Sequence, residues 1–110
     1  MIINVKNGEL EPIIDGSRVV VVEFHGAKCP DCKRMEQVLV ELNEEFLQKN
    51  LIIAKLDIAD IANRKLAVSM SLSSVPHIMV YHNGAVVVNR NGFMPLNLLS
   101  EQVSTYIETK

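Results

Sequence analysis

The chain has 110 residues, of which 48% are hydrophobic and 22% are charged, and its formal net charge at pH 7 is −2. This length predicts one domain over residues 1–110 with a single core, and the composition excludes a disordered chain. The near-neutral charge favours neither a nucleic-acid partner nor a membrane-surface partner, and the apolar runs are too short to span a bilayer.

The first residues of the sequence indicate the cellular compartment that we expect. Met1 to Asn4 shows no basic stretch followed by an apolar segment, so we expect no signal peptide and a cytoplasmic location. In a reducing cytosol, a protein with only two cysteines uses them for catalysis or metal binding more often than as a structural staple.

The first half of the sequence predicts a parallel sheet. Residues 2–6 predict a short edge strand, and residues 8–16 predict a short helical turn or loop. Residues 19–24 form a nearly continuous apolar and β-branched run, which is typical of a central parallel strand covered on both faces. Glu23 is the one charged residue in that run.

A helix and another strand follow. Residues 35–46 carry apolar side chains at the spacing of one helical face, and residues 51–57 form an apolar strand with Lys55 as its internal charge. A strand, a helix and a strand at this spacing predict a βαβ unit with parallel strands. The apolar face of the helix consists of Met35, Val38, Leu39, Leu42 and Phe46.

The second half predicts a short helix and then a hairpin. Asp60 can cap a short helix that carries Ile61 and Leu66, and residues 69–74 predict a loop. Asn83-Gly84 is a strong signal for a two-residue turn between antiparallel strands. Those strands are expected over residues 77–82 and 85–89, with Asn91-Gly92 ending the second.

Pro95 begins a last helix with an apolar face at Leu96, Leu99, Val103 and Ile107. The full order is therefore strand, short helix, strand, helix, strand, helix, strand, strand, helix. It predicts an α/β fold of three layers, α/β/α, around a mixed sheet with a parallel half and an antiparallel carboxyl-terminal hairpin.

Both cysteines lie between the central strand and the first long helix, in the sequence Cys29-Pro30-Asp31-Cys32. A C-x-x-C pair at a strand-to-helix junction favours redox chemistry over half of a zinc site. Pro30 suits the first helical position, and the free N–H groups of that turn favour a thiolate at Cys29. Cys29 is then expected to attack a disulfide and Cys32 to resolve the mixed disulfide that results.

The charges beside the cysteines oppose one another. Lys28 and Lys33 are expected to lower the pKa of the attacking thiol, and Asp31 is expected to raise it. These residues, together with Pro30, are therefore candidates for tuning the redox pair.

The sequence leaves other interpretations of the pair open. It could be a silent thiol pair, or it could bind zinc or an iron–sulfur cluster, in one copy of the chain or between two copies. A four-ligand zinc site needs two further donors, and none of the three histidines has ligand spacing to the cysteines in sequence. Those histidines are His25, His77 and His82.

The element order, the C-x-x-C at the start of the second helix and Val75-Pro76 ahead of the hairpin resemble thioredoxin over nearly the whole chain. Glu23 stands where that family has a buried aspartate, and Lys55 matches the lysine of the neighbouring strand. Val75-Pro76 matches the family's cis-proline, and Gly92 matches the glycine that lines the substrate groove. Asn83-Gly84 matches the hairpin turn.

The resemblance implies a thioredoxin fold and thiol–disulfide exchange between Cys29, Cys32 and protein substrates, with the protein as reductant. It implies that Glu23 assists proton transfer, that Lys55 tunes Glu23, and that Pro76 shapes the site. The implied substrate contacts are Val75, Gly92 and Phe93. It also implies no bound cofactor, a reductase that recycles the disulfide, and a monomer.

Three of these assignments have simpler alternatives. Glu23 could point to solvent, and Pro76 could be an ordinary trans proline. Phe93 and Met94 could pack on the last helix instead of meeting a partner.

The chain also departs from the family. It has no tryptophan, and Lys28 and His25 stand where the family's two tryptophans usually lie. Gln37 replaces the proline inside the second helix, so that helix is expected to lack a kink.

Overall fold

The elements follow one another in the predicted order in the computed structural model, which describes residues 1–16 and 18–107. The predicted domain also includes residues 17 and 108–110, which lie outside that part. The strands are β1 (Ile2–Val5), β2 (Val19–His25), β3 (Leu51–Asp57), β4 (His77–His82) and β5 (Ala85–Asn91). The helices are α1 (Glu11–Ile14), α2 (Pro30–Glu45), α3 (Ile61–Ser69) and α4 (Leu96–Tyr106).

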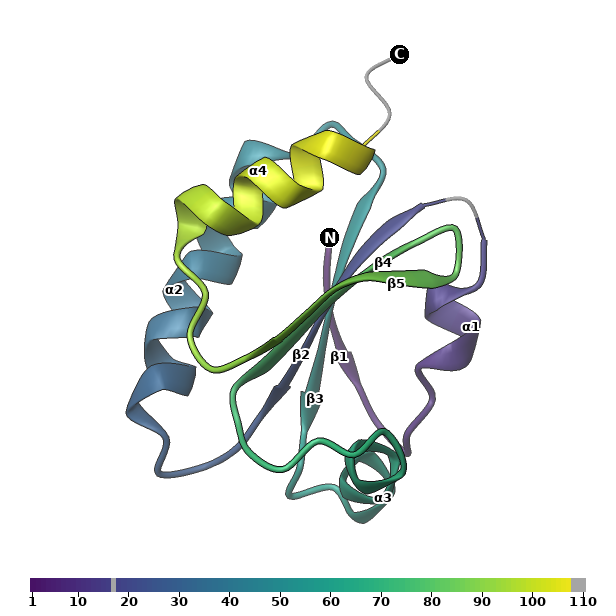
Figure 1. The fold of residues 1–110 in the computed structure, drawn as a ribbon, viewed down its shortest axis with the longest axis vertical. Coiled ribbons are helices and arrows are strands. Elements are labelled where there is room, and N and C mark those ends of the chain that lie inside the picture. The colour runs from purple at the N-terminus through teal and green to yellow at the C-terminus, as the bar shows by residue number, and fades with distance from the viewer. Residues whose placement is uncertain (17, 108–110) are drawn as a thin grey trace.

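The strands form one mixed sheet in the order β1-β3-β2-β4-β5. β3 pairs in parallel with β1 and β2, whereas β4 is antiparallel to both β2 and β5. Figure 1 shows α2 and α4 against one face of this twisted sheet and α1 and α3 on the other side. The prediction of a three-layer α/β/α fold with an antiparallel carboxyl-terminal hairpin is therefore confirmed.

β2 lies in the middle of the sheet because it is apolar on both faces. Val19 and Val21 pack into the core beneath α2 and α4, and Val20, Val22 and Phe24 pack into the core on the opposite face. Burying branched side chains on both faces is what a strand inside a layered α/β fold requires. The carboxyl end of this central strand leads directly to the cysteine pair.

α2 buries the predicted apolar stripe, whose five side chains are all at most 8% exposed. The helix starts at Pro30, before the stripe begins, and continues without interruption through Gln37. It is therefore longer than the apolar run alone predicts, because its first turn is set by the cysteine loop.

α3 differs from the expectation at one of its two named apolar residues, Ile61. Asp60 does cap it, accepting a hydrogen bond from the N–H of Asn63 (3.1 Å), but Ile61 is 69% exposed. The buried side chains are Asn63 and Ala67, and the expected Leu66 packs against the same core. Asn63 donates to the carbonyls of Val5 (2.9 Å) and Asp57 (3.1 Å). A polar anchor thus adds to the apolar contacts that fix this short helix to the sheet.

The hairpin turn has the expected chemistry. Asn83 and Gly84 have φ values of 53° and 80°, which are the left-handed conformations of a type I′ turn. β5 continues to Asn91, two residues beyond the expected end.

Candidate active site

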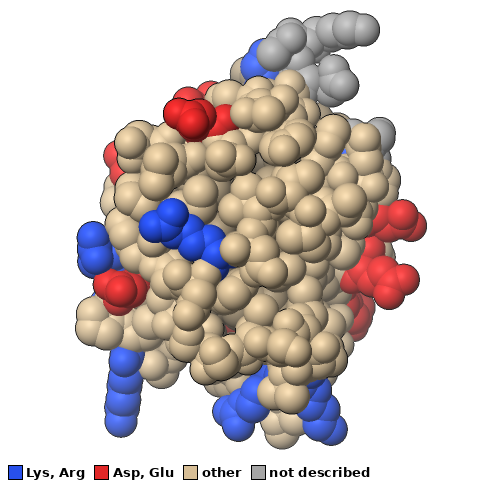
Figure 2. Space-filling view, viewed as in Figure 1, with Lys and Arg blue, Asp and Glu red and all other residues tan. Residues whose placement is uncertain are grey.

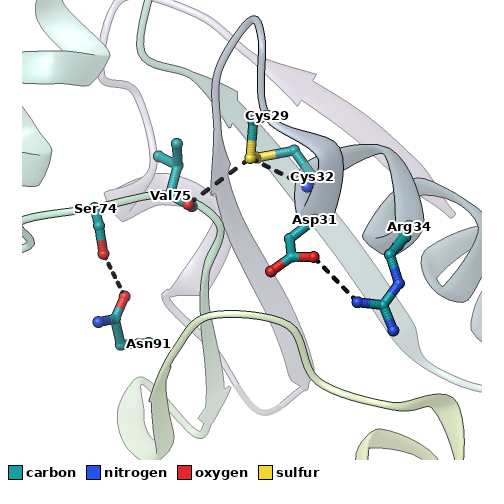
Figure 3. The surroundings of a disulfide bond; sticks show 7 residues. All are labelled: Cys29, Asp31, Cys32, Arg34, Ser74, Val75 and Asn91. Atoms are coloured by element: carbon teal, nitrogen blue, oxygen red, sulfur yellow. Dashed lines mark hydrogen bonds and ion pairs between the residues drawn. A yellow bond between two sulfur atoms is a disulfide. The ribbon is translucent and has the colours of Figure 1, made fainter.

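The cysteine pair lies at the point where β2 gives way to α2 (Figure 3). Cys29 is the N-cap residue of α2, and Pro30 is its first residue. The two Cα atoms are 5.2 Å apart, and the sulfurs form a disulfide. The backbone N–H of Cys32 donates to Sγ of Cys29 over 3.1 Å, so the first turn of the helix points a donor at this sulfur.

The two sulfurs differ in accessibility. Cys32, in the first turn of α2, is 8% exposed, whereas Cys29 is only half-buried. Sγ of Cys29 also lies 3.7 Å from the carbonyl oxygen of Val75 (Figure 3). An open cavity of about 510 Å³ lies against Cys29 and Val75, with Lys28 and Asp31 on its wall. An incoming sulfur can therefore reach Cys29 more readily than Cys32.

The segment before β4 forms the other wall of this cavity. The Val75–Pro76 peptide bond is cis, as the resemblance implied. The N–H of Gly92 donates to the carbonyl of Pro76 (2.8 Å), and Ser74 Oγ donates to Oδ1 of Asn91 (2.6 Å). Val75 and Gly92, which were expected at the substrate groove, therefore lie close together at one edge of the site. The two hydrogen bonds join the segment before β4 to the end of β5.

The Asp31 carboxylate beside the cysteines is paired with a basic side chain. Its Oδ1 accepts from a guanidinium nitrogen of Arg34 at 3.0 Å, and this guanidinium also lies over the ring of Phe93 at 3.9 Å. Arg34 was not among the predicted site residues, although its i, i+3 spacing from Asp31 was a visible signal. Phe93 packs against the core beneath α2 and α4 under that guanidinium, and Met94 is buried rather than available to a partner.

Lys28 and Lys33 are both exposed beside the cysteines. Lys28 has a φ of 54°, a left-handed conformation that is uncommon for a residue other than glycine. In the space-filling view, the charges at the lower tip are basic (Figure 2). In the same view of the ribbon, the connection from β2 to α2 and helix α3 lie at that lower end of the molecule (Figure 1).

Glu23 is buried, so the prediction that it faces the interior is confirmed. Its side chain is 1% exposed, and neither carboxylate oxygen has a hydrogen-bond partner among the described residues. Glu23 lies opposite Lys55 in the parallel pairing of β2 with β3. Burial raises the pKa of Glu23 to about 7, while the Lys55 ammonium lowers it and the Glu36 carboxylate raises it.

A second cavity, of about 290 Å³, joins Glu23 to the cysteine pair. Lys55, Glu36 and His25 lie on its wall together with Cys32. Burial lowers the pKa of His25, and the Lys55 ammonium lowers it further. Neither His25 nor Glu36 was a predicted site residue, although Glu36 follows Cys32 by one helical turn and so shares its face.

Nowhere in residues 1–16 and 18–107 do three metal-ligating side chains gather at one place. Within the same ranges, no helix has both the length and the apolar character needed to cross a bilayer.

Comparison with known proteins agrees with this geometry. The sequence model of the Thioredoxin family matches residues 2–105. A thioredoxin of Bacillus subtilis (strain 168) is 34% identical over 89 residues, which cover 81% of this chain and 83% of that protein. A thioredoxin of Chlorobaculum thiosulfatiphilum is 28% identical over 102 residues, covering 93% of this chain and 91% of that protein.

A solved structure shares the fold. A mutant thioredoxin from Halobacterium salinarum NRC-1 superposes with a TM-score of 0.83, covering 99% of this chain and 93% of that chain at 24% identity. Together with the cysteine pair at the start of α2, these matches show that the chain belongs to the thioredoxin family and is a thiol–disulfide oxidoreductase.

Proposed function

We propose that the protein reduces disulfide bonds of protein substrates, with Cys29 as the attacking residue and Cys32 as the resolving residue. The asymmetry between the two sulfurs carries this proposal. Cys29 borders an open cavity and accepts a helical N–H, whereas Cys32 is buried on a cavity that it shares with Glu23. The N–H and the helix dipole both stabilise a thiolate at Cys29.

The exchange has two steps. The Cys29 thiolate attacks a substrate disulfide, the substrate S–S bond breaks, and one substrate sulfur leaves as a thiolate that takes a proton from water. Cys32 then loses its proton to the Glu23 carboxylate and attacks Sγ of Cys29. The mixed disulfide breaks, the second substrate sulfur leaves, and two electrons have passed from the protein to the substrate.

Glu23 is suited to accept that proton. Its pKa of about 7 lies near neutral pH, where a group can both take up and release a proton. Lys55, its neighbour across β3, stabilises the carboxylate form and so tunes the equilibrium. The side chain faces the cavity with Cys32 and has no other partner among the described residues to hold its oxygens.

Substrate segments bind beside Val75 and Pro76 in this proposal. The cavity next to Cys29 ends at Val75, and the bond from Gly92 to Pro76 holds the neighbouring loop in place. Gly92 and Phe93 follow β5, where the Arg34 guanidinium covers the Phe93 ring, and they are the further substrate contacts of this proposal. Lys28, Pro30, Asp31 and Lys33 adjust the stability of the Cys29 thiolate.

The direction of the reaction, the partners and the compartment belong to the same proposal. Asp31 disfavours a thiolate beside it and so favours the disulfide, which makes the protein a reductant. A reductant that acts repeatedly needs an electron donor, which we take to be a disulfide reductase. We further propose a cytoplasmic monomer formed by one domain, residues 1–110, without a bound cofactor.

Trapping of the mixed disulfide tests the assignment of the cysteines. The variant Cys32→Ser should accumulate a mixed disulfide with an unfolded disulfide-containing protein such as insulin, and Cys29→Ser should not. Limiting iodoacetamide should label Cys29 of the reduced protein before Cys32. Preferential labelling of Cys32, or trapping by Cys29→Ser, would reverse the two roles.

A further inference from the structure

The cavity beneath the cysteine pair contains two carboxylates rather than one. Glu23 lines it from β2 and Glu36 from α2, and Cys32 of α2 lines it as well. Glu36 follows Cys32 by four residues, so both side chains project from one face of α2 toward this cavity. The helix that supplies the resolving sulfur therefore also supplies a second acid.

The two acids differ in their access to water. Glu23 is 1% exposed with both oxygens unpartnered among the described residues, whereas Glu36 is exposed. The other titratable or charged groups on the cavity wall are His25 from β2, Lys55 from β3, Lys28 and Cys29 from the loop, and Cys32 and Lys33 from α2. The solvated carboxylate thus lies at the outer side of a space whose inner wall holds the buried one.

We propose that Glu36 is a positioning residue that acts across this cavity: its carboxylate faces the same space as Glu23 and adds to the effect of burial in favouring the protonated acid beside Cys32. This inference rests on the proton-acceptor role proposed above for Glu23. Two like charges facing one small, partly desolvated space disfavour each other, and the buried member of the pair is the one that stays protonated.

The rate of the second step should therefore depend on pH. When Glu23 is the proton acceptor of Cys32, only its ionised form can take the proton, so the second step accelerates as pH rises through the titration of Glu23. Burial moves that titration toward neutral pH, Lys55 moves it the other way, and Glu36 adds a smaller shift toward neutral pH. The same protonated Glu23 can return its proton to the Cys32 sulfur when the disulfide is reduced again.

The test uses the isosteric, uncharged variant Glu36→Gln in the full chain. In the oxidised protein the cysteines do not titrate, so the ¹³C shift of the Glu23 carboxyl carbon can be followed against pH by NMR. Without the Glu36 charge its titration midpoint should fall by roughly 0.3–1 pH unit. The pH at which insulin reduction reaches half its maximal rate should fall with it.

The matched control is Glu41→Gln, which removes the same charge from an exposed position further along α2 and outside the cavity. It should leave the Glu23 midpoint unchanged. An equal shift in both variants, or no shift in Glu36→Gln, would overturn the inference.

Combining Glu36→Gln with Glu23→Gln distinguishes a failure of this inference from a failure of the proposed function. In Glu23→Gln, the substitution Glu36→Gln should no longer move the pH profile of insulin reduction. If Glu23→Gln leaves the profile unchanged, the role of Glu23 fails, even where the NMR titration shows that the two carboxylates interact. If Glu36→Gln still moves the profile in that background, Glu36 acts on a cysteine directly and the inference fails instead.

Discussion

The guanidinium of Arg34 lies over the ring of Phe93 at 3.9 Å while it pairs with Asp31 at 3.0 Å. One side chain thereby connects the first turn of α2 to the loop that precedes α4. It also places a positive charge against the only acid between the two cysteines. The charge that Asp31 presents to the Cys29 sulfur is therefore partly balanced within the site (Figure 3).

This arrangement makes opposite predictions for the two partners of the pair. Asp31→Asn should increase the thiolate fraction of Cys29 and raise the reduction potential, because it removes a charge that repels the thiolate. Arg34→Met keeps an apolar chain over Phe93 but leaves Asp31 unbalanced, so it should lower the potential. Both side chains are exposed, so each shift should stay within roughly 30 mV, a tenfold change in equilibrium constant.

The measurement is equilibration with glutathione and dithiothreitol buffers, beside a thiolate absorbance titration. Arg18→Met removes the same kind of charge beyond the amino end of β2, away from the cysteines, and should not shift the potential. Shifts of the same sign in Asp31→Asn and Arg34→Met would show that the loop geometry, not the charge, is what matters.

Glu23 should make stability depend on pH in a defined window. Its pKa is about 7 in the folded protein against 4.5 for the ordinary carboxyl, so the folded state binds the proton more tightly. Stability should therefore fall as pH rises from about 4.5 to about 7, by about 3 kcal/mol in total, and stay level above that. Glu23→Gln has no proton to lose, so this part of the pH dependence should vanish.

Urea unfolding of the oxidised protein at pH 5 and pH 8 measures the effect, since the disulfide cannot titrate. The wild-type protein should lose stability between these pH values, and Glu23→Gln should lose less. At pH 8 the variant should be the more stable of the two while its insulin reduction is slower. Parallel pH curves for the two proteins would place the Glu23 carboxylate in contact with water.

The sequence predicts the strands, the long helices and their order because each has a regular apolar period. It also predicts the burial of Glu23, since the acid interrupts an apolar run on both sides. It cannot predict that Arg34 would meet Phe93, because this contact joins residues distant in the chain and depends on how α2 packs beside the loop before α4. Glu36 is predictable only in part. Its spacing from Cys32 can be seen in the sequence, but the cavity that joins it to Glu23 cannot.

α3 shows a different limit of the sequence pattern. Its apolar residues include Ile61, which the fold leaves exposed, while its polar residue Asn63 is fully buried. Leu66 does pack against the core, so the apolar residues identify only part of the inward face of a short helix when backbone groups of other segments also need partners.

The last prediction follows from that role of Asn63. Its amide donates to the carbonyls of Val5 and Asp57, and its Oδ1 accepts from the N–H of Gly8 at 2.8 Å. Asn63→Ala would leave these backbone groups without a partner in a buried place, which should cost roughly 2–4 kcal/mol of stability. Urea midpoints of the oxidised proteins measure the loss, and Asn97→Ala, at an exposed position of α4, should change stability by less than about 1 kcal/mol.

Because the lost bonds join β1, β3 and α3 and do not touch the cysteines, the reduction potential of Asn63→Ala should match that of the wild type. A small loss of stability would mean that water replaces the amide, and a shifted potential would mean that α3 and the cysteine pair are coupled through the sheet.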